Sequence, residues 1–219
     1  VYALVPLVVF QAVLGMWTVT LLLKPLVVVA HLVGGIAILV LLWWNYLETK
    51  GLERIDHDLG ALPTLVRLAT LILFVQVCLG GWTSANYAAL TCADFPLCQG
   101  QWWPEMDFGE GFTLWRGLGV DYEFGVLETP ARTAIHFAHR VGAIAVTLVT
   151  LGVAVLGLRS DSGHLHSVAW CILAALAFQL TMGVTNVLGG LPLVVAVAHN
   201  AGAALLSVSL ITLVYFTRR

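Results

Sequence analysis

Long apolar runs separated by short polar segments dominate the chain. Each run approaches the roughly 20 residues that an α-helix needs to cross the hydrocarbon core of a bilayer. The six runs cover residues 1–23, 26–47, 64–82, 133–157, 167–189 and 193–217. They are continuously apolar and lack the alternation that marks a membrane β-strand. The pattern therefore predicts an all-α fold, a polytopic transmembrane helical bundle with six helices in this chain.

Composition excludes the main alternatives to a membrane protein. Hydrophobic residues fill 60% of the 219 positions and charged residues only 10%, whereas soluble domains carry about 25% charged residues. The formal net charge of −2 offers no basic surface for nucleic-acid phosphates. The lipid bilayer is therefore the expected environment, and no nucleic acid is expected as a partner.

The charges of the connecting segments predict an orientation. With the amino end inside, six Lys and Arg residues lie on the inner side and four on the outer side, although the outer side has the longest connection, residues 83–132. Short inner loops of membrane proteins are enriched in Lys and Arg. We therefore expect a multi-pass protein of a bacterial inner (plasma) membrane, with loop 83–132 in the periplasm.

An internal repeat relates the first two helices to the last two. A shift of 168 residues places segment 11–34 on segment 179–202 without a gap, and the polar and glycine identities are Gln11/Gln179, Gly15/Gly183, His31/His199 and Gly34/Gly202. A third Gln-x-x-x-Gly motif precedes the long loop, at Gln76 and Gly80. Ligand sites of membrane proteins commonly lie between or within such repeats. We interpret residues 1–50 as the second hairpin of one four-helix half and residues 62–219 as a complete second half, and we expect two helices ahead of Val1.

Three histidines lie at similar depths inside the apolar runs. His31, His139 and His199 each follow the expected outer helix end by six or seven residues, which is about 10 Å at 1.5 Å per residue. An ionisable side chain in a membrane span is a functional candidate. Two imidazoles on neighbouring antiparallel helices can bind haem iron from opposite faces. The alternative is a buried histidine that hydrogen-bonds a neighbouring helix.

Polar side chains near His139 are further candidates for a cofactor site. His136 shares a helix face with His139, and it is a supporting group, a proton carrier or a packing residue. Arg132 and Arg140 flank the two histidines. Guanidinium groups bind carboxylates in bidentate geometry, so these arginines are candidates for haem propionates, or else they anchor the helix at the membrane interface.

Two cysteines stand close together in the outer loop. Cys92 and Cys98 are separated by five residues, and oxidised pairs persist in the periplasm. A structural disulfide, a redox-active pair and a metal site all remain open, because spacing alone does not fix the chemistry.

Several motifs together resemble the haem A synthase family of cytochrome oxidase assembly. They are residues 11–19 with 30–32, residues 80–86, residues 92–98, Gln-Trp-Trp-Pro at 101–104, residues 131–140 and residues 196–200. The similarity extends over essentially the whole chain. It implies eight helices in two pseudo-symmetric halves, of which this chain corresponds to the last six.

The resemblance also implies roles for individual residues. His139 and His199 match the pair that binds a haem b cofactor, and His31 matches an axial position of the site for the substrate haem O, which makes it the catalytic candidate. Cys92 and Cys98 match a loop disulfide. The family oxidises a methyl group of haem O to the formyl group of haem A.

Other functions fit the same histidine pattern. One is a membrane cytochrome with bis-histidine haem b and no turnover, and another is an assembly or haem-delivery factor. For the enzyme, the expected partners are haem O, haem O synthase, other cytochrome oxidase assembly components and a second copy of the chain in a homo-oligomer.

Overall fold

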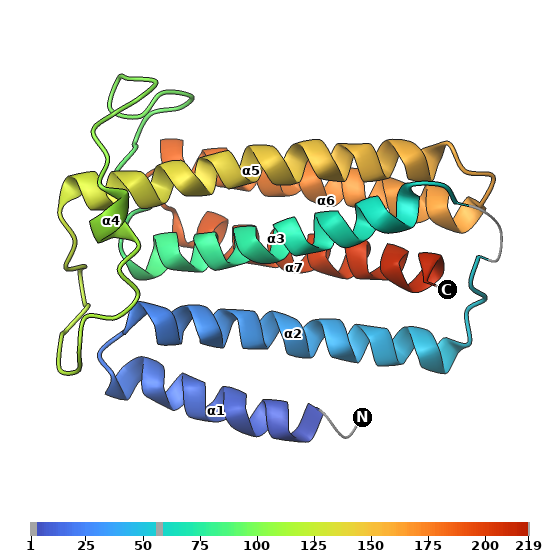
Figure 1. Cartoon of the computed structure of the whole chain (residues 1–219), viewed down its shortest axis with the longest axis horizontal. Helices are drawn as coiled ribbons and strands as arrows, with labels where there is room; N and C mark the ends of the chain where they lie inside the picture. Colours follow the sequence, from blue (N-terminus) through green and yellow to red (C-terminus); the bar gives the residue numbers. More distant parts are fainter. Residues whose placement is uncertain (1–3, 56–58, 219) are drawn as a thin grey trace.

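The computed structural model describes residues 4–55 and 59–218, and this part of the chain is a bundle of helices that run side by side (Figure 1). The long helices are α1 (Leu4–Thr20), α2 (Pro25–Lys50), α3 (Leu62–Ala85), α5 (Thr129–Leu158), α6 (Gly163–Leu188) and α7 (Leu193–Thr217), and α4 (Phe108–Gly111) is a single turn. All of the long helices except α1, which has 17 residues, are long and apolar enough to cross a membrane. The prediction of an all-α, multi-pass membrane protein is confirmed.

Four helices form a closed ring, with two more packed on one side. In the ring, α3 packs on α5, α5 on α6, α6 on α7, and α7 back on α3. Helices α5 and α7 are therefore diagonal to each other. Helix α2 packs against α3 and α7, and α1 packs on α2 at the edge of the molecule (Figure 1).

Three helices begin with proline in the first turn, where its missing N–H costs nothing and its fixed φ favours the helix. The prolines are Pro25, Pro63 and Pro130. The predicted start of the fourth run at residue 133 is wrong, because α5 begins at Thr129. Hydropathy misses this first turn because its side chains are buried under protein rather than lipid: Ala131 is 1% exposed and Thr133 is fully buried.

We call the end of the bundle that loop 83–132 covers the outer end and the opposite end the inner end. The apolar core of the ring lies at the inner end. Its fully buried side chains come from all four ring helices: Val66, Val153, Leu165, Ile172, Leu206, Leu210 and Leu213. The outer end has a smaller core around Trp82 and Ile135. The membrane histidines lie between these two cores along the axis of the bundle. The candidate site therefore has a firmly packed layer on either side.

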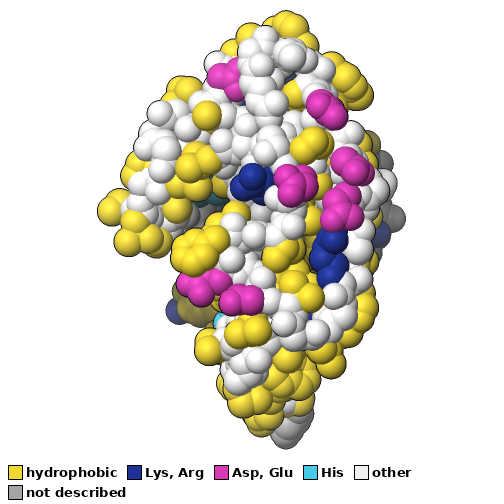
Figure 2. Space-filling view, turned by 90° about the vertical axis from the view of Figure 1, so that its left-hand side faces the viewer, with side chains coloured by type: hydrophobic (Ala, Val, Ile, Leu, Met, Phe, Trp, Pro, Cys, Tyr) yellow, Lys and Arg dark blue, Asp and Glu magenta, His cyan; other side chains and the backbone are white. Residues whose placement is uncertain are grey.

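The long loop covers the outer end of the bundle. Figure 2 looks onto this end and shows acidic side chains distributed among hydrophobic ones. The exposed hydrophobic residues of the loop include Trp102, Trp103, Leu118 and Phe124. The loop thus combines charged groups that face water with apolar groups suited to a membrane interface.

Candidate functional site

The same three groups meet on three pairs of helices. One helix of each pair carries Gln-x-x-x-Gly, and the other carries a histidine whose ring rests against that glycine. A Cβ on the glycine would lie only 3.0 to 3.2 Å from the imidazole Cε1, so the approach requires a residue without a side chain. The sets are Gln11, Gly15 and His31 on α1 and α2; Gln76, Gly80 and His139 on α3 and α5; and Gln179, Gly183 and His199 on α6 and α7.

Gln76 holds the ring of His139. Its amide nitrogen donates to the backbone carbonyl of His139 at 3.0 Å and lies 3.1 Å from the ring nitrogen Nδ1. Among the described residues, the other ring nitrogen, Nε2, makes no hydrogen bond. The nitrogen that usually ligates haem iron is therefore the free one.

The two remaining rings also keep a nitrogen without a partner. Gln179 Nε2 lies 3.2 Å from His199 Nε2, and Gln11 Nε2 donates to the carbonyl of His31. In both cases Nδ1 is buried and unpaired within the described part of the chain. Buried polar atoms are normally hydrogen-bonded, so these nitrogens point to a ligand-binding role.

His139 and His199 come from diagonal helices. The expectation of neighbouring antiparallel helices is wrong: α5 and α7 lie across the ring from each other, and both begin at the outer end. The two imidazoles are close enough to interact electrostatically. The equal spacing from the helix start is also corrected, because His139 lies ten residues from the start of α5 and His199 lies six from the start of α7. The additional turn of α5 extends beneath the loop.

The packing around the two rings suits a flat group. No residue of segments 137–145, 177–185 and 193–201 is buried, whereas the same helices contain fully buried side chains nearer the inner end. Cofactor sites in helical bundles lie between side chains of facing helices. The free ring nitrogens and the looser layer between two cores therefore fit an iron porphyrin held from both faces. No group of three His, Cys, Asp or Glu side chains in the described residues forms an alternative metal site.

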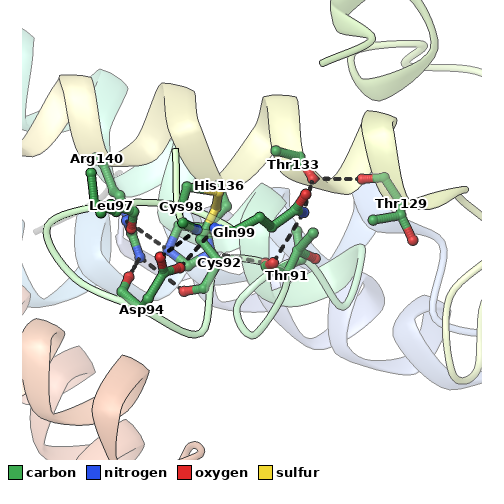
Figure 3. Close-up of a disulfide and its surroundings, with 12 residues drawn as sticks. Thr91, Cys92, Asp94, Leu97, Cys98, Gln99, Thr129, Thr133, His136 and Arg140 are labelled. Carbon is green, nitrogen blue, oxygen red and sulfur yellow. Dashed lines mark hydrogen bonds between the residues drawn. A yellow bond between two sulfur atoms is a disulfide. The ribbon is translucent and has the colours of Figure 1, made fainter. Parts of the chain in front are cut away.

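Arg140 fastens the disulfide loop to α5. Its guanidinium donates to the backbone carbonyls of Leu97 at 2.7 Å, Cys92 at 2.9 Å and Asp94 at 2.7 Å (Figure 3). Its Nε donates to His136 Nε2 at 3.1 Å. These bonds occupy the guanidinium, so in this arrangement Arg140 holds the loop directly above the turn that carries His139.

His136 takes part in the same set of contacts between α5 and the loop. Its Nδ1 lies 3.0 Å from the carbonyl of Ala88, and its Nε2 accepts from Arg140. With both ring nitrogens engaged and only 4% of its surface exposed, His136 links α5 to the loop. Among the roles considered for it, the geometry favours support of the neighbouring structure.

Arg132 differs from Arg140 in having an unsatisfied group. Its Nε is buried and has no hydrogen-bond partner among the described residues. Arg132 precedes His139 by seven residues, which is two helical turns and places both on one face of α5, about 10 Å apart along the axis. It remains a candidate to bind an acidic group that projects outward from a ligand at His139.

Cys92 and Cys98 form a disulfide, with Cα atoms 4.5 Å apart. The prediction of a disulfide between them is confirmed. Both residues are buried, at 0% and 3% exposure, and the ring they close is the segment that Arg140 grips. The bridge therefore shortens the stretch of loop that has to be held in place above the membrane histidines.

We expect Cys92 and Cys98 to resist alkylation by N-ethylmaleimide until a reductant is added, because the bridge leaves no thiol. Protein that has been reduced and unfolded provides the positive control, because Cys171, although free and exposed, lies on the membrane helix α6. Mass spectrometry of the loop peptide measures the outcome. Rapid labelling of the loop cysteines in untreated protein would contradict the bridge.

Asp94 orders the other side of the disulfide ring. Its carboxylate accepts from the backbone N–H groups of Gly100 and Gln99, both at 2.8 Å. These hydrogen bonds, that of Gly100 foremost, lower the pKa of Asp94 below its ordinary value. The ionised form therefore favours the closed loop.

This lowered pKa predicts a pH-dependent loop. The stabilisation from Asp94 is fully present above its ordinary pKa of about 4 and is lost as pH falls through the lower folded value. We expect cleavage of segment 93–101 by pepsin to accelerate as pH falls below about 4. The Asp94→Asn variant should be cleaved faster above pH 4 and show a weaker pH dependence. Superimposable profiles for the two proteins would refute this role.

A second part of the loop contacts the first hairpin. Lys24, at the turn between α1 and α2, donates to the carbonyl of Gly117 at 2.6 Å and lies 3.1 Å from the ring centroid of Trp115. The backbone N–H of Tyr122 donates to the carbonyl of Leu22 at 3.1 Å. The loop thus joins the His31 hairpin to the ring that carries His139 and His199.

The structure also reveals site residues that the sequence analysis left without a role. In the sequence the glutamines only mark the repeat, whereas in the structure each contacts the histidine of its own helix pair. The signal in the sequence is the pairing of Gln-x-x-x-Gly with His-x-x-Gly, present at His31, His139 and His199.

Comparison with known proteins identifies the family. A family model described as cytochrome oxidase assembly protein, COX15-CtaA, matches residues 1–211. The chain belongs to this family. It is 42% identical to the haem A synthase of Shewanella oneidensis over 217 residues, which cover 97% of this chain and 64% of the relative.

Two further curated relatives carry the same name. The haem A synthase of Rhizorhabdus wittichii is 31% identical over 83% of this chain and 48% of its own length, and that of Caulobacter vibrioides is 29% identical over 90% and 56%. The chain therefore spans about half to two thirds of the length of these members of the COX15-CtaA family.

Proposed function

We propose that this chain is part of a haem A synthase, an oxidoreductase that converts a methyl group of haem O into the formyl group of haem A. In this proposal, His139 and His199 bind a haem b cofactor, and His31 provides an axial position for haem O. The observation that carries the proposal is the pair of imidazoles on the diagonal helices α5 and α7, each resting on a glycine and each with a nitrogen that has no partner among the described residues. Membership of the COX15-CtaA family supports it.

The geometry supports a division of labour between the histidines. A haem iron bound by two histidines has no open coordination position, so haem b held by His139 and His199 would supply electron transfer rather than oxygen activation. The protein's contribution is to hold both rings at fixed positions across the four-helix ring. His31 lies on α2, which packs against α3 and α7, so the two sites would be adjacent.

The domain and membrane assignments are part of the same proposal. Residues 1–50 would be the second hairpin of one half, and residues 62–219 the complete other half, since α1/α2 and α6/α7 repeat the same Gln, Gly and His contacts. Loop 83–132 would face the periplasm of a bacterial inner membrane. The disulfide supports this side because such bonds persist in oxidising compartments.

Haem O synthase, other cytochrome oxidase assembly components and a second copy of the chain are the proposed protein partners. Haem O must come from a haem-modifying enzyme, and haem A must pass to an oxidase apoprotein. Both are hydrophobic, so direct handover within the membrane is favoured.

We predict that Arg132→Ala lowers haem affinity about tenfold, the scale of losing a group that supports a metal site. Arg132 has an unsatisfied Nε on the His139 face, suited to a propionate. Arg159→Ala, at the inner end of α5, is the matched control. Haem retained per protein during dilution measures the effect, and equal retention in both variants would remove Arg132 from the site.

The function is tested by extracting and weighing the haems bound to the protein expressed from its complete reading frame with haem O available. Haem b together with haem O and newly formed haem A supports the enzyme. Haem b alone, without conversion of haem O, would instead support the electron-transfer cytochrome. Protein that binds no haem would overturn the proposal and favour an assembly factor.

A further inference from the structure

The three glutamines inside the membrane helices occupy equivalent places. The chain has five glutamines. The three in long helices are those that contact a histidine: Gln11, Gln76 and Gln179. A polar amide in a membrane helix needs internal partners, because lipid offers none. A glutamine amide contacts the histidine in each of the three helix pairs, which indicates a role beyond packing.

A glycine on the histidine helix admits each amide. A Cβ at Gly142 would lie 3.2 Å from Gln76 Cδ, and one at Gly34 would lie 3.1 Å from Gln11 Cδ. At Gly202 a Cβ would collide with the amide oxygen of Gln179. Each amide therefore lies flat against the backbone three residues beyond the histidine.

Each amide oxygen is left without a donor. Gln11 Oε1, Gln76 Oε1 and Gln179 Oε1 are all buried and unpaired within the described residues. Leaving a buried acceptor unsatisfied costs about 1–3 kcal/mol, and here the same cost recurs three times. In each glutamine, therefore, the amide nitrogen contacts the histidine, while the amide oxygen has no hydrogen-bond partner among the described residues.

A metal-bound histidine supplies the missing donor. When Nε2 binds a metal, Nδ1 carries a proton and donates it to an acceptor, which fixes the ring and raises its basicity. Gln76 Nε2 lies 3.1 Å from His139 Nδ1, and a half-turn of the amide exchanges its nitrogen and oxygen positions. Because two acceptor oxygens repel each other, the exchanged amide must also turn away from the His139 carbonyl, which keeps its helical hydrogen bond.

We propose that Gln76 is a positioning residue that accepts the Nδ1 proton of the axial histidine His139. The inference rests on the proposed haem-binding function. It assigns to the Gln76 amide the orientation of the His139 imidazole and the tuning of the iron's reduction potential, because hydrogen bonding to an axial ligand is one of the protein's means of setting that potential.

Substitution of Gln76 separates this role from packing. In the haem-loaded protein, Gln76→Glu keeps the size of the side chain but accepts the Nδ1 proton more strongly, so the haem midpoint potential should move to a more negative value. Gln76→Leu removes the acceptor, so the potential should move to a more positive value. Both variants should keep the bis-histidine absorption spectrum.

Gln101→Glu is the matched control, because Gln101 is exposed in the outer loop and the change adds the same group without touching a histidine. Redox titration followed by absorbance gives the midpoint potentials. A Gln76→Glu variant that titrates like wild type and Gln101→Glu, with haem bound, would overturn the positioning role and leave the haem site intact. Wild-type protein that binds no haem would overturn both the inference and the proposed function.

Discussion

Replacing either His139 or His199 with alanine is expected to abolish the bis-histidine haem spectrum. Each ring supplies one axial bond, and the helices that carry the two rings, α5 and α7, lie on opposite sides of the four-helix ring. His136 cannot substitute without releasing Ala88 and Arg140. Absorbance and electron paramagnetic resonance of the purified variants measure the change.

The matched substitution is His166→Ala. His166 lies near the inner start of α6, where its ring contacts the carbonyl of Ser160 at 2.6 Å, remote from the histidine layer. This variant should keep the wild-type haem spectrum. A wild-type spectrum in either the His139 or the His199 variant would show that the assigned pair is wrong.

A side chain at Gly80 or Gly183 is expected to displace the imidazole that rests on it. In Gly80→Ala the new Cβ would lie 3.2 Å from His139 Cε1, and in Gly183→Ala it would lie 3.1 Å from His199 Cε1. Both distances require the ring to shift by a few tenths of an ångström. We expect haem affinity to fall about tenfold for alanine, within the range typical of perturbed metal-site surroundings, and haem to be lost for leucine.

Gly163→Ala provides the control for this series. Gly163 is the first residue of α6, and a Cβ there meets no atom within 4 Å. Haem content per folded protein, with folding checked by circular dichroism, measures the effect. Wild-type haem content in Gly80→Leu and Gly183→Leu would contradict the close ring contact on which the site depends.

The membrane architecture could be predicted from the sequence because apolar runs report lipid exposure directly. The exact ends of the helices could not be predicted as well. Helix α3 extends to Ala85 and α5 begins at Thr129, beyond the expected limits of 82 and 133, since Thr83 and Thr133 are buried by the loop. Burial beneath another segment of protein leaves no hydropathy signal.

The sequence identifies the membrane histidines, but it does not predict how they are arranged in space. Depth along a helix follows from residue spacing, whereas the order of helices around the ring depends on packing between segments distant in sequence. Proximity in the chain likewise suggested a shared role for Arg132 and Arg140. Their surroundings separate them: Arg140 is occupied by the carbonyls of a loop some 45 residues away, and the Nε of Arg132 has no hydrogen-bond partner in the part of the chain that the structure describes.

A density map of the haem-loaded protein in a lipid environment gives the most direct test of the central claim. We predict one porphyrin between α5 and α7, with iron bound by the imidazoles of His139 and His199 and the propionates directed toward the outer loop. Rings turned away from each other, with lipid or packed side chains between them, would contradict the account.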